Sequence, residues 1–372
     1  MKSVRVACHQ PAGTHTMVSM THVPHLLRLR AVGLSLAVLL VATACGSDDP
    51  PPDGASSDGS LDGVTITVYS GRDEELIQPV FDLFEAETGA TVEARYAGSA
   101  DQALLIDTEG DNSPADVFIS QSPGAMGFLD QQGRLSLLSA DTLDRVDESF
   151  RSESGSWVGI TGRVRVLVYN TDAVDESELP RSILELTDPA YAGRVAVAPA
   201  NGSFQDFVTA MRAELGDEAT ADWLDGMAAN DAPNYPKNSA IVDAVARGEI
   251  DMGLVNHYYL VESLEEDPDL PAANHVFADG DLGSLLITTA AGVIDSSDSP
   301  DAAEALVAFL LSDAAQELSA NGEKEYPLVD SVPAPDGLEP LADLAAIVVD
   351  LDVLAGGLTG TQELIDQSGI QQ

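Results

Sequence analysis

The sequence predicts an α/β protein with two lobes joined by two strands, in the manner of a clamshell. Strand-like runs alternate with helix-like runs through most of the chain, and this alternation is typical of a mainly parallel sheet. Two extended runs, 157–170 and 283–294, suit strands that pass from one lobe into the other. No internal repeat indicates a different architecture.

The first 44 residues are a predicted export signal. Arg28 and Arg30 precede an uncharged run, 31–44, that ends in small residues next to Cys45. The run is too short to span a bilayer permanently. Because the small residues run directly into a cysteine, we expect a lipoprotein signal, with Cys45 as the lipidated first residue on the extracellular face of the membrane. A cleaved secretory signal with an incidental Cys45 is the alternative.

Residues 45–61 are a predicted flexible tether, rich in Gly, Ser, Asp and Pro. The mature chain that follows is long enough for two lobes. We expect the first lobe to be discontinuous, comprising 62–162 and 286–372, and the second to comprise 163–285.

Composition excludes several classes of protein. The formal charge is −45, and the four basic residues that leave with the signal take the mature chain to −49. So negative a chain is a poor partner for nucleic acid. The mature region has no cysteine besides Cys45 and retains only His257 and His275, which excludes a disulfide, a thiolate metal site and a clustered histidine zinc site.

The first third of the mature chain has three predicted strands, each ending in polar residues. The strands are 64–69, 91–96 and 115–120, with helices predicted after the first two. Ligands bind at the carboxyl ends of parallel strands. The candidate positions at these ends are therefore 70–73, 98–99 and 120–122.

The region after the first long run repeats this alternation. Residues 194–198 form a predicted strand, and residues 250–256 form another. The predicted helices of this region are 204–214, 219–228 and 240–247, and Ser299-Pro300 begins a further one in the expected way.

Tyr258 and Tyr259 follow the strand-like run that ends at Asn256 and lie where a helix is expected to begin. A phenol titrates near pH ~10, so it binds a metal only if the cation is acidic enough to displace its proton. Ferric iron meets that condition, and oxygen donors suit it. Adjacent tyrosines also occur as ordinary packing, each ring buried with its hydroxyl bonded to a neighbour.

Several motifs occur in the order found in one family. They are Val68-Tyr69-Ser70-Gly71-Arg72, Ala115-Asp116-Val117-Phe118-Ile119-Ser120-Gln121, Thr161-Gly162-Arg163-Val164-Arg165, Lys237-Asn238-Ser239, Gly248-Glu249-Ile250, Asn256-His257-Tyr258-Tyr259 and Glu325-Tyr326-Pro327. Over about 62–335 the chain thus resembles the ferric-iron-binding periplasmic proteins, the solute receptors of ABC importers that are related to transferrin lobes. The resemblance implies a type II periplasmic-binding-protein clamshell that delivers iron to a permease and an ATPase.

The resemblance also implies roles for individual residues. Tyr258 and Tyr259 would be the ligands of Fe³⁺, which is the cargo. A synergistic anion, carbonate or phosphate, would contact Thr161, Gly162, Asn238 and Asn256, with Arg163 and Arg72 as charge partners. Backbone donors and an arginine suit such an anion site. Arg163 could equally form a salt bridge across the hinge.

Two positions depart from the family's pattern. Asp73 stands where several members have a histidine ligand, and Gln121 stands where they have a glutamate. A neutral amide is a weaker ligand for a hard cation than a carboxylate. Asp73 could supply a charge or could cap a helix.

Other functions remain as alternatives. The same clamshell could bind an oxyanion or a phosphonate without metal, using Thr161, Gly162, Arg163 and Asn238. The mature region has no His-Glu-x-x-His motif, no P-loop and no Gly-x-Ser-x-Gly motif, so we do not expect an enzyme. An adhesive lipoprotein would not need the cleft motifs. We expect a monomer anchored to the membrane through Cys45.

Overall fold

The computed structural model describes residues 60–277, 280–344, 346–349, 354 and 357–371. The predicted signal, Cys45 and all but the last two residues of the predicted tether lie outside these ranges. The strands follow one hydrogen-bonded path in the order β2-β1-β3-β8-β4-β6-β5, with β10 paired to β8 and with β7 and β9 paired to β4.

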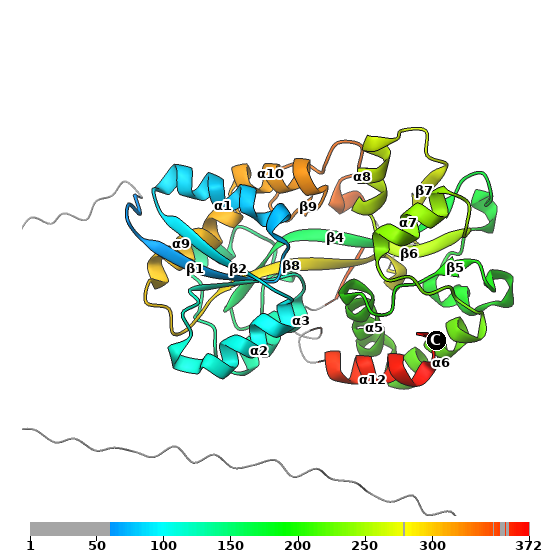
Figure 1. The fold of residues 1–372 in the computed structure, drawn as a ribbon, viewed down its shortest axis with the longest axis horizontal. Helices are drawn as coiled ribbons and strands as arrows, with labels where there is room; N and C mark the ends of the chain where they lie inside the picture. The colour runs from blue at the N-terminus through cyan, green and yellow to red at the C-terminus, as the bar shows by residue number, and fades with distance from the viewer. Residues whose placement is uncertain (1–59, 278–279, 345, 350–353, 355–356, 372) are drawn as a thin grey trace, which may run out of the picture. The chain divides into compact units, whose positions relative to one another are not determined.

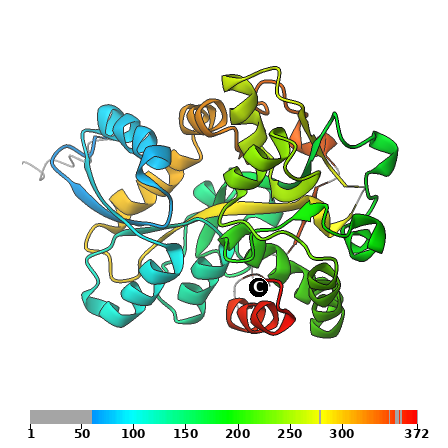
Figure 2. The ribbon, with the colours of Figure 1, turned by 45° about the vertical axis from the view of Figure 1, so that its right-hand side comes forward.

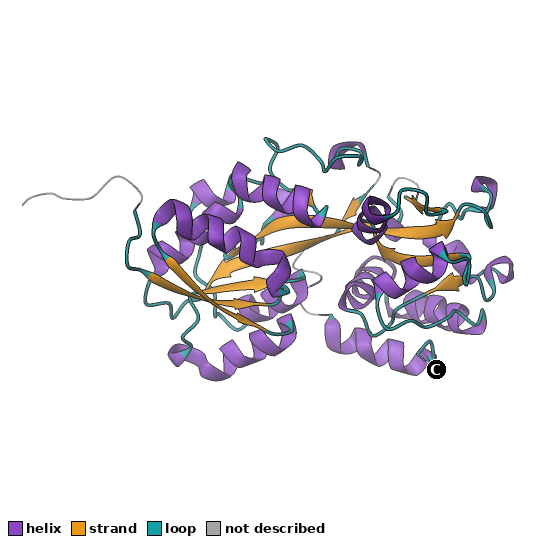
Figure 3. Cartoon of the chain, turned by 45° about the horizontal axis from the view of Figure 1, so that its top comes forward, coloured by secondary structure: helices purple, strands orange, loops and turns teal. Residues whose placement is uncertain are grey.

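The first strand group consists of three parallel strands, as the alternation of strands and helices predicts. Its members are β1 (Thr65–Ser70), β2 (Thr91–Tyr96) and β3 (Val117–Ser120). Helices cover both faces of this group (Figure 3). They are α1 (Glu74–Thr88), α2 (Ser99–Glu109), α3 (Pro123–Gln131), α9 (Pro300–Leu310) and α10 (Asp313–Glu323).

Alternation of apolar residues explains why both faces are covered. Val68 and Ile119 belong to the core shared with α1 and α9, whereas the next or preceding residues, Tyr69 and Phe118, belong to the core shared with α2 and α3. Successive side chains of a strand point to opposite faces, so a strand that is apolar at every position needs a helical layer on each side.

Two long strands connect the first group to the second, as predicted. They are β4 (Trp157–Asn170) and β8 (Leu285–Val293), which pair antiparallel (Figure 1). Every residue of both strands is buried. The short strand β9 (Tyr326–Pro327) pairs with β4 at Thr161 and Gly162.

The second strand group is built on the C-terminal half of β4, with β6 and β7 on its two edges. It comprises β5 (Val195–Ala196), β6 (Met252–Asn256) and β7 (Ala272–His275). Its helices are α5 (Gly202–Leu215), α6 (Asp217–Ala229), α7 (Asn238–Ala246) and α8 (Tyr258–Glu266). The remaining short elements are α4 (Ala140–Leu143), β10 (Ile347–Val348) and the 3₁₀ turns Gly110–Asn112, Glu148–Phe150, Glu176–Glu178, Ile183–Thr187, Pro189–Tyr191, Leu282–Ser284 and Leu341–Asp343. Within the described residues, every helix is too short or too polar to cross a membrane.

The last helix, α12 (Leu358–Ser368), packs against α5 and α6 (Figure 2). The hydroxyls of Thr209 and Thr361 are 2.8 Å apart, and Nη1 of Arg212 donates to the Gly357 carbonyl at 2.6 Å. The predicted division places 286–372 wholly in the first lobe and does not account for these contacts. We therefore propose that α12 belongs with the second lobe.

Candidate metal-binding site

The tyrosine pair lies at the start of α8, directly after β6 ends. The ring centroids of Tyr258 and Tyr259 are 4.2 Å apart and the rings are inclined by 34°. Tyr258 is only 8% exposed, whereas Tyr259 is half-buried. Neighbouring side chains of a helix usually diverge, but these two rings lean together, so both phenols face the same part of the site.

Burial sets the protonation of Tyr258. It raises the pKa of Tyr258 far above the usual phenol value, and the neighbouring Tyr259 raises that pKa further, while Arg163 opposes the rise. The phenol is therefore neutral at physiological pH until a cation displaces its proton. A hard trivalent cation can do so, and binding then releases protons.

Two buried arginines of β4 stand beside the pair. Arg163 and Arg165 are two residues apart, so their side chains leave the same face of the strand. Arg163 donates to the backbone oxygen of Gln121 and, from Nη1, to Oγ1 of Thr289 at 3.1 Å. Nε of Arg163 and Nη2 of Arg165 are buried without a hydrogen-bond partner. Burial lowers the pKa of Arg165 to about 10, which leaves it charged at neutral pH.

Asn256 connects Arg165 to the N-terminus of α5. Its Oδ1 accepts from Nη1 of Arg165 at 3.1 Å, and its Nδ2 donates to Oγ of Ser203 at 3.1 Å. Asn201 caps α5 by accepting from the Ser203 backbone N–H. A helix N-terminus favours anions, so Ser203 joins the predicted Asn256 as a candidate anion contact. Ser203 was not predicted from the sequence, although Asn201 before the helical run was the signal for a helix start.

Asn238, predicted to contact the anion, is the first residue of α7. It is fully buried, and neither its Nδ2 nor its Oδ1 has a hydrogen-bond partner. A buried amide without partners costs roughly 1–3 kcal/mol, so such a side chain is expected where a ligand supplies the missing bonds. Asn238 is thus compatible with its predicted role.

Thr161 and Gly162 do not have contacts that support an anion role. The Thr161 hydroxyl donates to the carboxylate of Glu325. Gly162 is paired with Thr288 and Tyr326 inside the sheet. A Cβ at Gly162 would meet the Leu286 side chain at 2.9 Å, so apolar packing surrounds this position. Both residues belong to the place where β4, β8 and β9 pair. Local sequence could not predict these contacts because the partner residues are distant in the chain.

Arg72 is also already engaged. Its guanidinium donates to Glu323 and, at 3.1 Å, to Glu325, and it reaches Oγ1 of Thr289 at 2.7 Å. The predicted contact of Arg72 with a bound anion therefore lacks support, because both ends of its fork are occupied by protein carboxylates. Arg72 still interacts electrostatically with Tyr258, so it remains a charge partner for a tyrosinate.

The two carboxylates on Arg72 differ in protonation. Burial raises the pKa of Glu323 to about 8, although Arg72 opposes the rise. Burial acts in the same direction on Glu325, but Arg72 and Arg163 together hold its pKa below the usual value. Glu325 is therefore the ionised partner of the arginines. Glu325 was predicted only as part of the motif Glu325-Tyr326-Pro327, and Glu323 was not predicted.

Asp73 and Gln121, the two positions that differ from the family's pattern, have different environments. Asp73 is exposed at the N-cap of α1, where its side chain makes no capping hydrogen bond. Gln121 is half-buried, and its Oε1 is enclosed without a hydrogen-bond partner. Gln121 is the better placed of the two to offer an oxygen. Across the described ranges, no group of three or more His, Cys, Asp or Glu side chains is arranged to hold a metal, so a metal here would depend on the phenols.

Asp206 is a further buried carboxyl group, and it was not predicted from the sequence. This residue of α5 is 9% exposed, and burial raises its pKa to about 6, opposed by Arg163, the Ser122 hydroxyl and Arg165. Ser122 follows the first strand group, whereas Asp206 belongs to a helix of the second. Their proximity depends on tertiary structure that local pattern does not encode.

We expect the substitution Asp206→Asn to stabilise the metal-free protein at pH 8. The folded pKa lies above the unfolded value of 3.8, so the wild-type carboxyl favours folding below that value and loses this advantage as pH rises through about 6. A difference of about two pKa units corresponds to roughly 3 kcal/mol. Urea unfolding at pH 8 and pH 4.5 measures the effect, which should shrink at the lower pH.

The exposed variant Asp141→Asn serves as the control for Asp206→Asn and should change the free energy of unfolding by less than about 0.5 kcal/mol. Equal stabilisation at both pH values would contradict an origin in the buried charge.

The fold and the site define an extracellular solute-binding protein rather than an enzyme. Residues 112–349 match the family model described as bacterial extracellular solute-binding protein. The chain belongs to the family of ferric-iron-binding periplasmic solute-binding proteins.

The relatives cover most of the chain. The Fe(3+)-binding periplasmic protein of Serratia marcescens is 32% identical over 77% of this chain and 85% of its own length. The major ferric iron-binding protein of Neisseria meningitidis serogroup A is 34% identical over 82% of this chain and 93% of its own. Iron-bound HitA from Pseudomonas aeruginosa matches with a TM-score of 0.77 and 34% identity, over 82% of this chain and 99% of that chain. The predicted periplasmic-binding-protein fold is thereby confirmed.

Proposed function

We propose that this protein captures ferric iron outside the cell and delivers it to the permease and ATPase of an ABC importer. The observation that carries the proposal is the pair of phenols, Tyr258 and Tyr259, that lean together beside two buried arginines. The Neisseria meningitidis relative named for ferric iron binding covers 82% of the chain. We further propose that Cys45 carries a lipid anchor and that the protein acts as a monomer.

Charge balance supports a synergistic anion. Two tyrosinates cancel two of the three charges of Fe³⁺, and an anion can neutralise the third and fill further coordination positions. The unpaired donors on Arg163, Arg165 and Asn238 suit an oxyanion such as carbonate or phosphate. A related protein from Trichodesmium has been solved in complex with iron and citrate, so citrate belongs among the anions to test.

A spectrophotometric titration tests the proposal. Metal-free protein receives Fe³⁺ with carbonate, phosphate or citrate, and a visible tyrosinate-to-iron charge-transfer band should develop and saturate at one ion per chain. Ga³⁺, which has the same charge but gives no such band, provides the control for protein absorbance. A protein that binds no iron with any of these anions contradicts the proposal.

A metal-free oxyanion receptor is the second candidate. The unpaired buried amide of Asn238 and the unpaired guanidinium nitrogens favour it as well, because an oxyanion alone could occupy them. Calorimetry with phosphate or a phosphonate in metal-free buffer separates the two functions. Tight binding without iron, together with no charge-transfer band, would favour this second function.

A further inference from the structure

His257 lies between the last residue of β6 and the first tyrosine, and all its polar atoms are engaged. The Val164 backbone N–H donates to Nδ1 at 3.2 Å, and Nε2 lies 2.8 Å from the Lys324 carbonyl oxygen. Because Nδ1 accepts a hydrogen bond, Nε2 carries the hydrogen and donates to Lys324. Burial lowers the pKa of His257 to about 4, so the ring is neutral near pH 7.

The His257 ring also packs between two tyrosines. It lies against Tyr326 of β9, with centroids 4.8 Å apart, and meets Tyr258 edge-on at 5.8 Å and 89°. Its backbone N–H donates to the Val164 carbonyl, and its carbonyl accepts from Nδ2 of Asn274. The residue before the tyrosine pair is therefore fixed by β4, β7 and β9 together.

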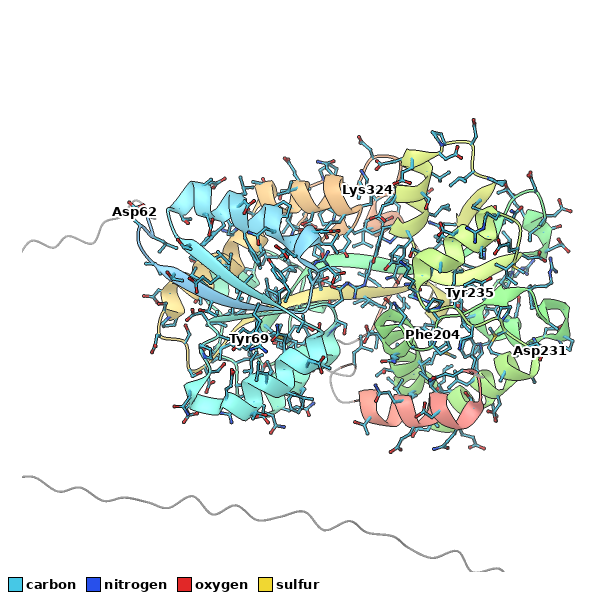
Figure 4. All side chains as sticks on the ribbon, in the orientation of Figure 1. Asp62, Tyr69, Phe204, Asp231, Tyr235 and Lys324 are labelled. Atoms are coloured by element: carbon cyan, nitrogen blue, oxygen red, sulfur yellow. The ribbon has the colours of Figure 1, made fainter. Side chains whose placement is uncertain are left out.

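Lys324, the acceptor of the Nε2 bond, has an unusual backbone conformation. It ends α10 with a φ of 58°, in the left-handed region that L-residues with a side chain rarely adopt. Its Nζ lies 2.7 Å from Oε1 of Glu265 on α8. Lys324 thus connects the end of α10 to α8, and Figure 4 labels it at this place.

The neighbours of Lys324 belong to the charged cluster beneath the site. Glu323 and Glu325 hold Arg72, and Glu325 interacts electrostatically with Tyr258. A hydrogen bond from His257 to the Lys324 carbonyl therefore joins the start of α8 to the segment whose carboxylates surround Arg72. If that segment moved, the hydrogen bond would move His257 with it, and Tyr258 is the next residue in the chain.

We propose that His257 is a positioning residue that holds Tyr258 in its metal-binding orientation by tying the start of α8 to Lys324. This inference rests on the proposed function. The hydrogen bond from His257 to Lys324 holds the Tyr258 phenol near Arg163 and Glu325. Loss of this bond lets Tyr258 reorient, so the bound ion dissociates faster. No such role follows from the motif alone, because Lys324 is 67 residues away.

Three substitutions test His257 by separating its two ring bonds. His257→Phe keeps an aromatic ring and removes both bonds. His257→Gln keeps a donor at the position of Nε2, which can still reach Lys324, whereas His257→Asn keeps an acceptor at the position of Nδ1, which can reach only Val164. The readouts are the rate of iron release to an excess of a competing chelator and the wavelength of the charge-transfer band.

We expect His257→Phe and His257→Asn to release iron on the order of tenfold faster, a change that corresponds to ~1.4 kcal/mol. Both should also shift the band. His257→Gln should restore the release rate to within about threefold of wild type, because the bond to Lys324 is retained. Thermal unfolding of each metal-free variant identifies any that fail to fold, and the comparison of Gln with Asn then decides the matter.

Glu265→Gln is the matched control, since it removes only the exposed carboxylate that meets Lys324 Nζ. Its release rate should stay within about twofold of wild type, because exposed ion pairs contribute little. Equal rates for the Gln and Asn variants, or an unchanged rate for His257→Phe, would overturn the positioning role while leaving iron binding intact. Absence of a band in the wild type would instead contradict the proposed function.

Discussion

Replacing both Tyr258 and Tyr259 with phenylalanine should abolish the charge-transfer band and weaken ferric-iron binding by about a thousandfold or more. Changes outside the ligand shell already cost about 10–100-fold in metal affinity, and this change removes the two proposed anionic ligands themselves. The rings are retained, so their 4.2 Å packing and the fold should survive. Absorbance during ferric titration, with circular dichroism as the check on folding, measures the outcome.

Two single variants separate the contributions of the two phenols, and a tyrosine far from the pair in sequence serves as the control. Tyr258→Phe removes the more buried phenol, beside Arg163, and Tyr259→Phe removes the phenol that interacts electrostatically with Arg165. Each should shift and weaken the band. The control Tyr191→Phe removes a hydroxyl that donates to the Glu178 carbonyl at 3.1 Å and should leave the band unchanged. A double variant that retains the wild-type band would contradict tyrosine ligation.

Local pattern predicted the elements that carry the site. The strand predicted at 91–96 is reproduced by the structure residue for residue. The long extended run predicted at 157–170 likewise corresponds to β4, and the tyrosine pair does begin a helix. These features depend on the periodicity of neighbouring residues, which the sequence displays directly.

The residues that contact these β4 side chains could not be predicted from local sequence pattern. Thr161, Arg163 and Arg165 share one face of β4, but only the pairing of Arg165 with Asn256 brings that arginine to the end of β6. Thr161 pairs instead with Pro327 and donates to Glu325, 164 residues away. Whether a residue of β4 faces the proposed ligand site or packs where β4, β8 and β9 meet thus depends on how distant strands pair with β4.

The substitution Arg72→Met should destabilise the protein by roughly 3–5 kcal/mol at pH 7, because it removes the charge that compensates buried carboxylates. Arg72 is 2% exposed and bonds to Glu323 and Glu325. Methionine keeps much of the side-chain volume, so the loss is mainly electrostatic. Urea unfolding of the metal-free variant measures it.

The pH dependence and a second ion pair identify the origin of this loss. The pKa of Glu325 is held below its usual value, so the stability that it contributes is present above the unfolded pKa of 4.5 and is lost as pH falls through the folded value. The penalty of Arg72→Met should therefore shrink on acidification. It should also shrink in the double variant Arg72→Met with Glu325→Gln, because no unpaired carboxylate then remains at that position.

The control variant is Arg134→Met, because the partners of Arg134, Asp107 and Asp111, are partly or fully exposed. This variant should lower the free energy of unfolding by less than about 1 kcal/mol. A penalty for Arg72→Met that equals the Arg134→Met value would show that the buried carboxylates do not need Arg72, and Arg163 alone would then have to keep Glu325 ionised.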